Sequence, residues 1–134
     1  MPERSADWLS QAQRDLERAR LDVQHGYFEW ACFTSQQAAE KAVKAVHYFG
    51  NRSVRGHGIL KLLHPLVEDL PDSERLLHAA RILDRYYIEA RYPNGFPAGK
   101  PADYFDLSLA KEAVDAAEII IGFALQRISR DHCD

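Results

Sequence analysis

Cysteine is scarce in this chain of 134 residues, which contains only Cys32 and Cys133. The first lies inside a stretch with a helical pattern and the second near the C-terminus. The pair provides neither a disulfide framework nor the repeated spacing of a metal site, so a disulfide-rich secreted scaffold is excluded. Two free thiols suit the reducing conditions of the cytoplasm, and we expect a cytoplasmic protein.

Long hydrophobic runs are also missing. Although 46% of the residues are hydrophobic, the chain has no run of about 18 apolar residues, which a membrane-spanning helix requires. The N-terminus lacks the charged and then apolar segment that marks a secretory signal. We therefore expect neither membrane insertion nor a membrane partner.

Charge of one sign does not accumulate anywhere in the chain. The 17 basic and 20 acidic residues give a net charge of -3 and are mixed along the sequence. Because there is no basic run or tail, indiscriminate binding to nucleic acids is not expected. A local basic patch at an oligomer interface would not change this sum, so RNA binding at such a patch stays open.

The spacing of metal ligands is absent as well. His57, His64 and His78 are not four residues apart, and no neighbouring carboxylate completes a ligand set with them. We expect no metal site and no cofactor.

Helical periodicity of the apolar residues runs through the sequence, and no strand pattern competes with it. The length suits one domain, so residues 1–134 should form a single helical bundle domain. Pro65 removes a backbone hydrogen-bond donor, which should kink or divide the third helix. The expected fold is all-α: an antiparallel up-and-down helical bundle of four long helices and one short, broken helix. The helices are expected at about 5–25, 27–50, 57–70, 73–91 and 106–130.

The stretch from Tyr27 to Gly50 is the longest unbroken helical pattern in the chain. Alanines recur in its middle at helical spacing, and valines widen the apolar stripe beyond what one partner helix needs. Small side chains allow neighbouring helices to approach closely. We expect this helix to lie at the centre of the bundle.

Residues 92–105 interrupt the helical patterns, because they hold three of the six prolines and two of the seven glycines. No regular element tolerates that composition, so a loop is expected. Loops of this length in helical bundles are commonly functional, which makes the segment a candidate lid or contact segment.

Four stretches of this sequence form a recognisable series: DWLSQAQRDLERAR, GYFEWACFTSQQAAEKAVKAV, GHGILKLL and EARYPNG. Together they resemble the HEPN family of small helical-bundle proteins, whose order and spacing they follow over nearly the whole chain. The resemblance implies a homodimer, frequent pairing with a minimal nucleotidyltransferase and, in several branches, a metal-independent RNA-cleaving toxin. The family name reflects a proposed nucleotide-binding role.

The resemblance also implies candidate binding residues, which match the recurring family pattern. They are Gln37, Ala38, Glu40, Lys44, His57, Arg91, Tyr92 and Pro93. Physical chemistry gives several of them a plausible role. His57 opens a helix, where the dipole favours a neutral imidazole that can accept or donate a proton. Arg91 ends a helix, and its planar guanidinium suits a phosphate or a carboxylate.

Structural roles compete with these binding roles. Glu40 and Lys44 form an i,i+4 pair that can simply stabilise a helix. His57 can cap its helix or bond within the bundle, and Arg91 can pair with a helix carboxylate such as Glu40.

Catalysis is a separate hypothesis, because the RNase branches of the family carry an arginine followed four to six residues later by histidine. That spacing occurs at Arg20 and His25, at Arg52 and His57, and at Arg127 and His132. Of these pairs, only Arg52 and His57 combine a general base and a cation near a helix start, where an anion is welcome. They are the catalytic candidates if the chain is a ribonuclease.

The family's catalytic motif belongs to the second half of the bundle, where this chain instead has DRYYIEARYP without a following histidine. This departure favours a non-catalytic function: a dimeric module that binds a nucleotide or a minimal nucleotidyltransferase as part of a two-component, toxin-antitoxin-like system. The binding surface would be formed by Gln37, Glu40, Lys44, His57, Arg91 and Tyr92. A metal-independent RNase toxin of the same system, acting on RNA at the dimer interface, is one alternative, and a dimeric scaffold without a ligand is the other.

Overall fold

The structure, a computed structural model, describes residues 3–133, with side chains for residues 3–129. Its α-helices are α1 (Ser5–Gln24), α2 (Phe28–Phe49), α3 (Ile59–Val67), α4 (Ser73–Asp84), α5 (Tyr86–Glu89) and α6 (Leu107–Cys133). Two short 3-10 helices, η1 (Pro93–Gly95) and η2 (Pro101–Asp103), lie between α5 and α6. The described part of the chain contains no strand, so the predicted all-α class is confirmed.

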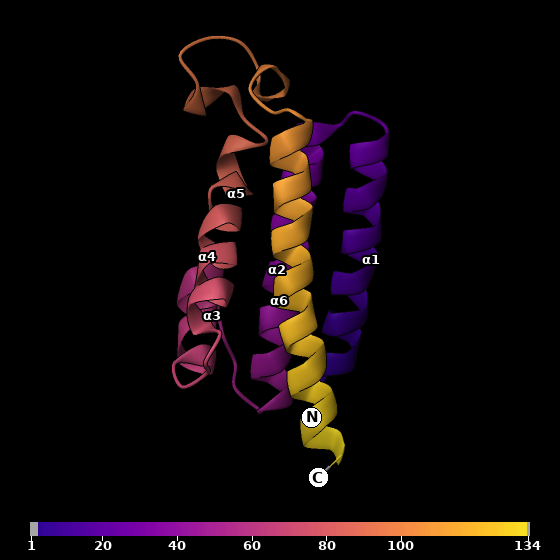
Figure 1. Ribbon diagram of the computed structural model, residues 1–134, viewed down its shortest axis with the longest axis vertical. Coiled ribbons are helices and arrows are strands. Elements are labelled where there is room, and N and C mark those ends of the chain that lie inside the picture. Colours follow the sequence, from indigo (N-terminus) through magenta and orange to yellow (C-terminus); the bar gives the residue numbers. More distant parts are fainter. Residues whose placement is uncertain (1–2, 134) are drawn as a thin grey trace.

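The long helices run up and down along the molecule (Figure 1). Helix α1 rises from the end that carries both termini, α2 returns, α4 rises on the far side of α6, and α6 descends again. The short helix α3 packs beside α4, and the segment between α5 and α6 projects from the opposite end. This is the antiparallel bundle that the sequence predicts.

Helix α2 is the centre of the bundle, as predicted, because it contacts α1, α3, α4, α5 and α6. Its alanines have no exposed surface, and they are Ala31, Ala38, Ala39, Ala42 and Ala45. A helix surface without bulky side chains allows neighbouring backbones to come close on several sides. The position of α2 therefore follows from its composition.

Helix α3 corrects one of the two effects predicted for Pro65, which were a kink or a division of the helix. Pro65 does not divide the helix but lies inside it, and the helix ends two residues later at Val67. A proline so near the C-terminus removes only one backbone hydrogen bond of the last turn. The interruption falls instead at Arg85, between α4 and α5, where the sequence predicts one helix. Arg85 keeps helical dihedral angles of -64° and -25°, so the chain changes direction little.

The start of α3 is tied to the end of α4 by Asp84. Its Oδ1 accepts a hydrogen bond from the Ile59 N–H (2.8 Å), and its Oδ2 accepts one from the Leu60 N–H (3.0 Å). The first backbone N–H groups of a helix have no partner within the helix. Asp84 supplies that partner, and its negative charge suits the positive end of the helix dipole.

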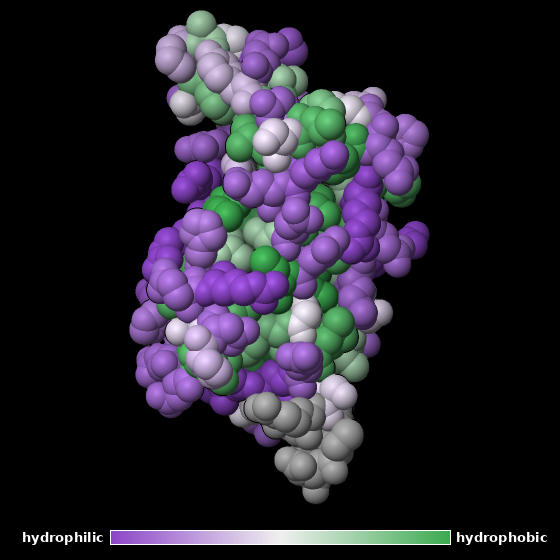
Figure 2. Space-filling model, in the orientation of Figure 1, coloured by the Kyte–Doolittle hydropathy of each residue, from purple (hydrophilic) through white to green (hydrophobic). Residues whose placement is uncertain are grey.

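The loop of residues 92–105 is present as predicted, except that it contains the two 3-10 turns. It projects at one end of the bundle (Figure 2) and is anchored there by Phe105, whose ring packs edge-on against Tyr86 with centroids 5.6 Å apart. Within it the rings of Phe96 and Tyr104 stack at 4.2 Å, and the Tyr104 hydroxyl donates to the Ala98 carbonyl (2.6 Å). These contacts give the segment an internal structure of its own.

Cys32 is a core residue without exposed surface, and burial raises the pKa of its thiol to about 12. A thiol with so high a pKa is a poor nucleophile near neutral pH. The side chain of Cys133 lies outside the described residues. No helix in residues 3–133 has the length and apolar character needed to cross a membrane.

We expect Ala42→Leu to lower the free energy of unfolding by about 1–3 kcal/mol, because the added atoms must displace the helices that pack on α2. Ala42 has no exposed surface. Urea denaturation measures the change. Ala6→Leu, at an exposed position of α1, is the control and should change the free energy by less than about 0.5 kcal/mol. Equal effects of the two variants would contradict close packing around α2.

Asp84→Ala should lower the free energy of unfolding by about 0.5–2 kcal/mol, the usual cost of losing a helix cap. The variant leaves the N–H groups of Ile59 and Leu60 without their acceptor. Asp69→Ala removes an exposed carboxylate beyond the end of α3 and serves as the control. If both variants unfold at the wild-type urea concentration, Asp84 does not stabilise the start of α3.

Candidate functional site

Glu40 is the centre of a polar network inside the bundle. Its side chain is 7% exposed, and its carboxylate accepts hydrogen bonds from Lys44 Nζ (3.1 Å) and Gln36 Nε2 (3.3 Å). These residues lie four positions apart on α2, so they form one row along the same face of the helix. The row is polar and buried, and it lies in the middle of α2, which spans Phe28–Phe49.

The pair of Glu40 and Lys44 is buried rather than solvated. The Lys44 side chain is only 10% exposed. Burying both charges costs several kcal/mol per ion, which close contact and further hydrogen bonds offset. The i,i+4 pair predicted from the sequence is therefore present, but it lies in the interior, where losing one partner leaves an uncompensated charge.

His57 connects this network to the surface. Its Nδ1 lies 3.1 and 3.2 Å from the two carboxylate oxygens of Glu40, and because a carboxylate only accepts, Nδ1–H is the donor. The His57 carbonyl accepts a hydrogen bond from Gln36 (3.1 Å), which in turn accepts one from Gln37 (2.7 Å). The His57 side chain is 55% exposed, so the buried charge of Glu40 is linked to a group that solvent can reach.

Tyr87 forms one wall of the site. Its ring stacks on the His57 imidazole with centroids 4.4 Å apart and an angle of 17° between the planes. The neighbouring Tyr86 is buried, at 4% exposure, while Tyr87 is half-buried. Because adjacent residues of a helix point in different directions, only one of the two tyrosines faces the core.

Arg91 lies among aromatic rings, one of which, Tyr87, also stacks on His57. Its guanidinium carbon is 4.3 Å from the centroid of Phe33, 4.9 Å from that of Tyr87 and 5.1 Å from that of Tyr92. Its Nε donates to the Tyr87 carbonyl (2.9 Å). No hydrogen bond from the terminal nitrogens of Arg91 to another described residue is present. The group is held in place with its planar fork available to an anion.

The alternative role considered for Arg91, an ion pair with a helix carboxylate such as Glu40, is not found among the described residues. Glu40 is satisfied by Gln36, Lys44 and His57, whereas Arg91 is held by aromatic rings and a carbonyl. An arginine can lie against aromatic faces without a carboxylate, because the ring quadrupole attracts its charge.

Arg52 and His57, the candidate catalytic pair, have separate partners. The Arg52 Nε–H donates to His47 Nδ1 (3.2 Å), and His47 Nε2–H donates to the Leu62 carbonyl (2.8 Å), which fixes the neutral tautomer of His47. The N–H groups at the start of α3, where an anion was expected to be welcome, are bonded to Asp84.

The other arginine and histidine pairs have structural partners as well. Arg20 pairs with Glu118 at 2.6 Å, and Arg127 Nη2 donates to the Leu66 carbonyl (2.8 Å). His132, the partner expected for Arg127, has a side chain outside the described residues.

Sequence reasoning missed Gln36, Phe33, Tyr87 and Asp84. Gln36 could have been found, because it lies four residues before Glu40 and so shares its face of the helix. The sequence identified Tyr87 and Phe33 as aromatic residues, but it gave no sign that they would contact His57 and Arg91. Asp84 gave no local signal, because the helix that it caps lies about 25 residues earlier in the chain.

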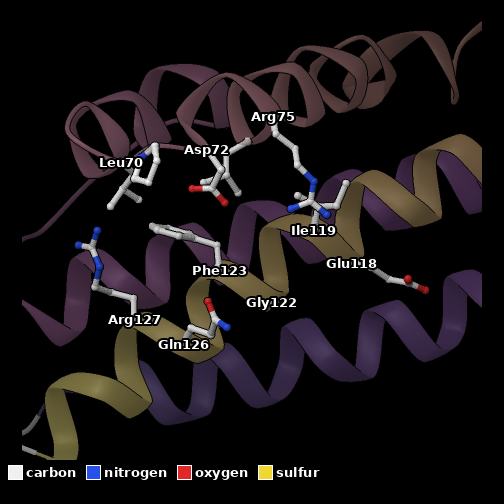
Figure 3. Close-up of a pocket in the computed structure, with 11 residues that line it drawn as sticks. Leu70, Asp72, Arg75, Glu118, Ile119, Gly122, Phe123, Gln126 and Arg127 are labelled. Atoms are coloured by element: carbon white, nitrogen blue, oxygen red, sulfur yellow. The ribbon is translucent and has the colours of Figure 1, made fainter.

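A separate cavity of about 430 Å³ lies between the start of α4 and the second half of α6 (Figure 3). Arg75 of α4 and Arg127 of α6 lie at its two ends, with the Phe123 ring between them. None of the candidate residues on α2, His57 or Arg91 lines it. Within the described residues, no group of three or more histidine, cysteine, aspartate or glutamate side chains is arranged to hold a metal ion.

Three solved structures are similar to this chain over nearly its whole length. The crystal structure of TT1696 from Thermus thermophilus superposes with a TM-score of 0.89 at 42% identity, covering 94% of this chain and 99% of that chain. ST0689, an archaeal HEPN homologue, gives 0.80 at 38% identity, covering 95% and 99%. The HEPN domain protein TM0613 from Thermotoga maritima gives 0.74 at 35% identity, covering 92% and 98%.

The comparison with curated proteins found no match. The family model of the HEPN domain matches residues 5–128, which is nearly the whole chain. Because this family model matches nearly the whole chain, and a solved relative is 42% identical over 94% of it, the chain belongs to the HEPN domain family.

Proposed function

We propose that this HEPN domain protein is a binding module that holds an anionic group of a nucleotide, or of a partner nucleotidyltransferase, on the rim formed by His57, Arg91 and Tyr92. The observation that carries the proposal is the guanidinium of Arg91. It is fixed by three aromatic rings and one carbonyl, while its terminal nitrogens are not bonded to another described residue. In the two-component system that the family resemblance implies, the partner is a minimal nucleotidyltransferase.

A fixed guanidinium is a good anion receptor for two physical reasons. Its fork matches the oxygens of a phosphate or a carboxylate and forms two charge-assisted hydrogen bonds. Its rotamer is already set by the surrounding rings, so less conformational entropy is lost when the ligand binds. Tyr92, 47% exposed beside Arg91, adds an aromatic surface for a base or for a partner side chain.

The proposal includes a homodimer. A groove of about 460 Å³ lies between α4 and α6, where Figure 2 shows hydrophobic residues along the face of the bundle. The groove has an apolar part made of Ala79, Ile82, Ala116 and Ile119. Lys111 and Glu112 lie on its rim with opposite charges. A second copy, related by a two-fold axis, can therefore bring basic side chains opposite acidic ones.

A metal-independent ribonuclease is the second candidate, and one observation favours it. His57 donates through Nδ1 to the buried Glu40 carboxylate, which leaves its exposed Nε2 as the basic nitrogen. A carboxylate that orients a histidine in this way is the arrangement of a general base. Against this candidate, Arg52 is bonded to His47 and the start of α3 to Asp84, so neither offers a phosphate site beside His57.

We expect adenosine monophosphate to bind the protein more tightly than adenosine, and Arg91→Gln to weaken that binding by about tenfold or more, because a charge-assisted hydrogen bond is lost. Isothermal titration calorimetry measures both affinities. Arg85→Gln removes an exposed arginine close in sequence and is the matched control.

The partner is tested by purifying the tagged protein from its own host. A nucleotidyltransferase should accompany the wild type and the Arg85→Gln variant, and Arg91→Gln should lose it. If Arg91→Gln binds the nucleotide and the partner as tightly as the wild type does, the rim is not the binding site.

The dimer is tested by light scattering, which gives the mass of the particle in solution. A mass of one chain would contradict the dimer.

In excess chelator, a mixed RNA pool should remain intact when it is incubated with the purified protein. Any cleavage that appears should be compared with His57→Ala, Arg52→Ala and Glu40→Gln variants of verified fold. Cleavage lost in His57→Ala and Glu40→Gln would support a ribonuclease with His57 as base and would overturn the binding-module proposal. Cleavage that survives in all of the variants would indicate a contaminating nuclease.

A further inference from the structure

Asn94 and Gly95 form an asparagine-glycine pair in η1, on the loop that projects at one end of the bundle (Figure 1). The backbone nitrogen of the residue that follows an asparagine can attack the asparagine side-chain amide. Glycine permits this attack most readily, because it has no Cβ to obstruct it and its backbone is conformationally free. The pair is therefore a candidate site of spontaneous deamidation, and the proposed function uses neither residue.

The structure leaves the reacting groups of this pair accessible. Asn94 and Gly95 are both exposed. The Asn94 side chain makes no hydrogen bond to any residue in the described part of the chain. Exposed loops without such bonds are also the segments of a protein that move most easily. Nothing therefore holds the Asn94 amide away from the Gly95 nitrogen.

Asn51 is the only other asparagine in the sequence, and it gives an internal comparison. It is exposed as well, but it is followed by Arg52, which carries a long side chain. The Arg52 backbone N–H also donates to the His47 carbonyl (2.9 Å). An attack by this nitrogen would have to break that hydrogen bond, so Asn51 should persist where Asn94 reacts.

The reaction at Asn94 needs water and no other reagent. The Gly95 nitrogen forms a bond to Asn94 Cγ and gives up its proton, while the side-chain nitrogen leaves as ammonia and a five-membered succinimide ring closes. One water molecule then opens the ring. Opening at the new bond gives aspartate, and opening at the original peptide bond gives isoaspartate, in which the chain runs through the side chain. An amide is thus exchanged for a carboxylate without oxidation or reduction.

We propose that Asn94 deamidates spontaneously in the folded protein and that the resulting carboxylate weakens anion binding at the rim of His57, Arg91 and Tyr92. The new charge arises two residues after Tyr92. It lies on η1, which packs against α5, and Gly95 is so close to Glu89 that a Cβ on Gly95 would be 3.6 Å from Glu89 Cγ. A carboxylate there repels an anion at the end of α5, because charges act on one another over about 8–10 Å at physiological salt.

The isoaspartate product also changes the loop itself. It adds one carbon to the backbone between Pro93 and Phe96, where the Phe96 N–H donates to the Pro93 carbonyl (3.0 Å). The effect on the rim rests on the proposed function, whereas the modification does not.

The modification is tested by incubating the full chain for several days at 37 °C and pH 8 and analysing tryptic peptides by mass spectrometry. Circular dichroism verifies that the incubated protein stays folded. The peptide that begins at Tyr92 should convert to the acid form, and the peptide that ends at Arg52 should keep Asn51 as the amide. A sample digested at time zero corrects for deamidation during digestion.

Gly95→Ala is the matched variant and should convert about tenfold more slowly, because its Cβ hinders the attack. The loop can accept this methyl group, since its only neighbour at Gly95 is Glu89 Cγ, at an ordinary contact distance. No acid form above the time-zero sample, equal conversion at Asn51, or an unchanged rate in Gly95→Ala would overturn the modification.

The effect on the rim is tested with Asn94→Asp, which reproduces one product. Isothermal titration calorimetry should show adenosine monophosphate binding this variant about twofold or more weakly than the wild type, because the added charge is partly screened by salt. Asn94→Gln keeps the neutral amide and should bind like the wild type. Equal binding by Asn94→Asp and the wild type would overturn the effect on the rim. If the wild type does not bind the nucleotide, the proposed function fails together with this effect, while the mass measurement still decides the modification.

Discussion

The buried carboxylate of Glu40 is the constraint on which the rest of the candidate site depends. A charge in the interior of a bundle is tolerated only when other groups pair with it and complete its hydrogen bonds. Lys44 and Gln36 do so from the same helix, and His57 does so from the segment that leads into α3. The need to compensate one charge therefore brings the chain after α2 back onto α2.

Between this buried network and the surface, contacts among aromatic rings and one guanidinium group form the rest of the site. His57 stacks on Tyr87, Tyr87 and Phe33 lie beneath the guanidinium of Arg91, and Tyr92 lies beside it. Each contact contributes little free energy by itself, but together they fix the orientation of the Arg91 guanidinium. The position of Arg91 thus depends on the buried pair of Glu40 and Lys44 through His57 and Tyr87. The cap that Asp84 places on α3 supports the same region, because His57 lies just before that helix.

Arg91 combines a fixed position with terminal nitrogens that have no hydrogen-bond partner among the described residues. Its guanidinium lies against the rings of Phe33, Tyr87 and Tyr92, and Tyr92 is 47% exposed. Arginine and aromatic residues are enriched where proteins bind one another. This combination is the reason for placing the proposed binding site at Arg91.

Local periodicity in the sequence determined the helices, the central position of α2 and the row of Gln36, Glu40 and Lys44, because residues three or four apart share a helix face wherever the helix lies. Composition likewise determined the loop of residues 92–105. Tertiary structure alone decided which distant groups meet: His57 reaches Glu40 across 17 residues, and Asp84 reaches Ile59 across 25. It also placed Arg91 on aromatic rings instead of on Glu40, and buried Asp22 with one oxygen unpaired among the described residues. Such pairings depend on how the helices pack against one another, and sequence spacing does not encode that packing.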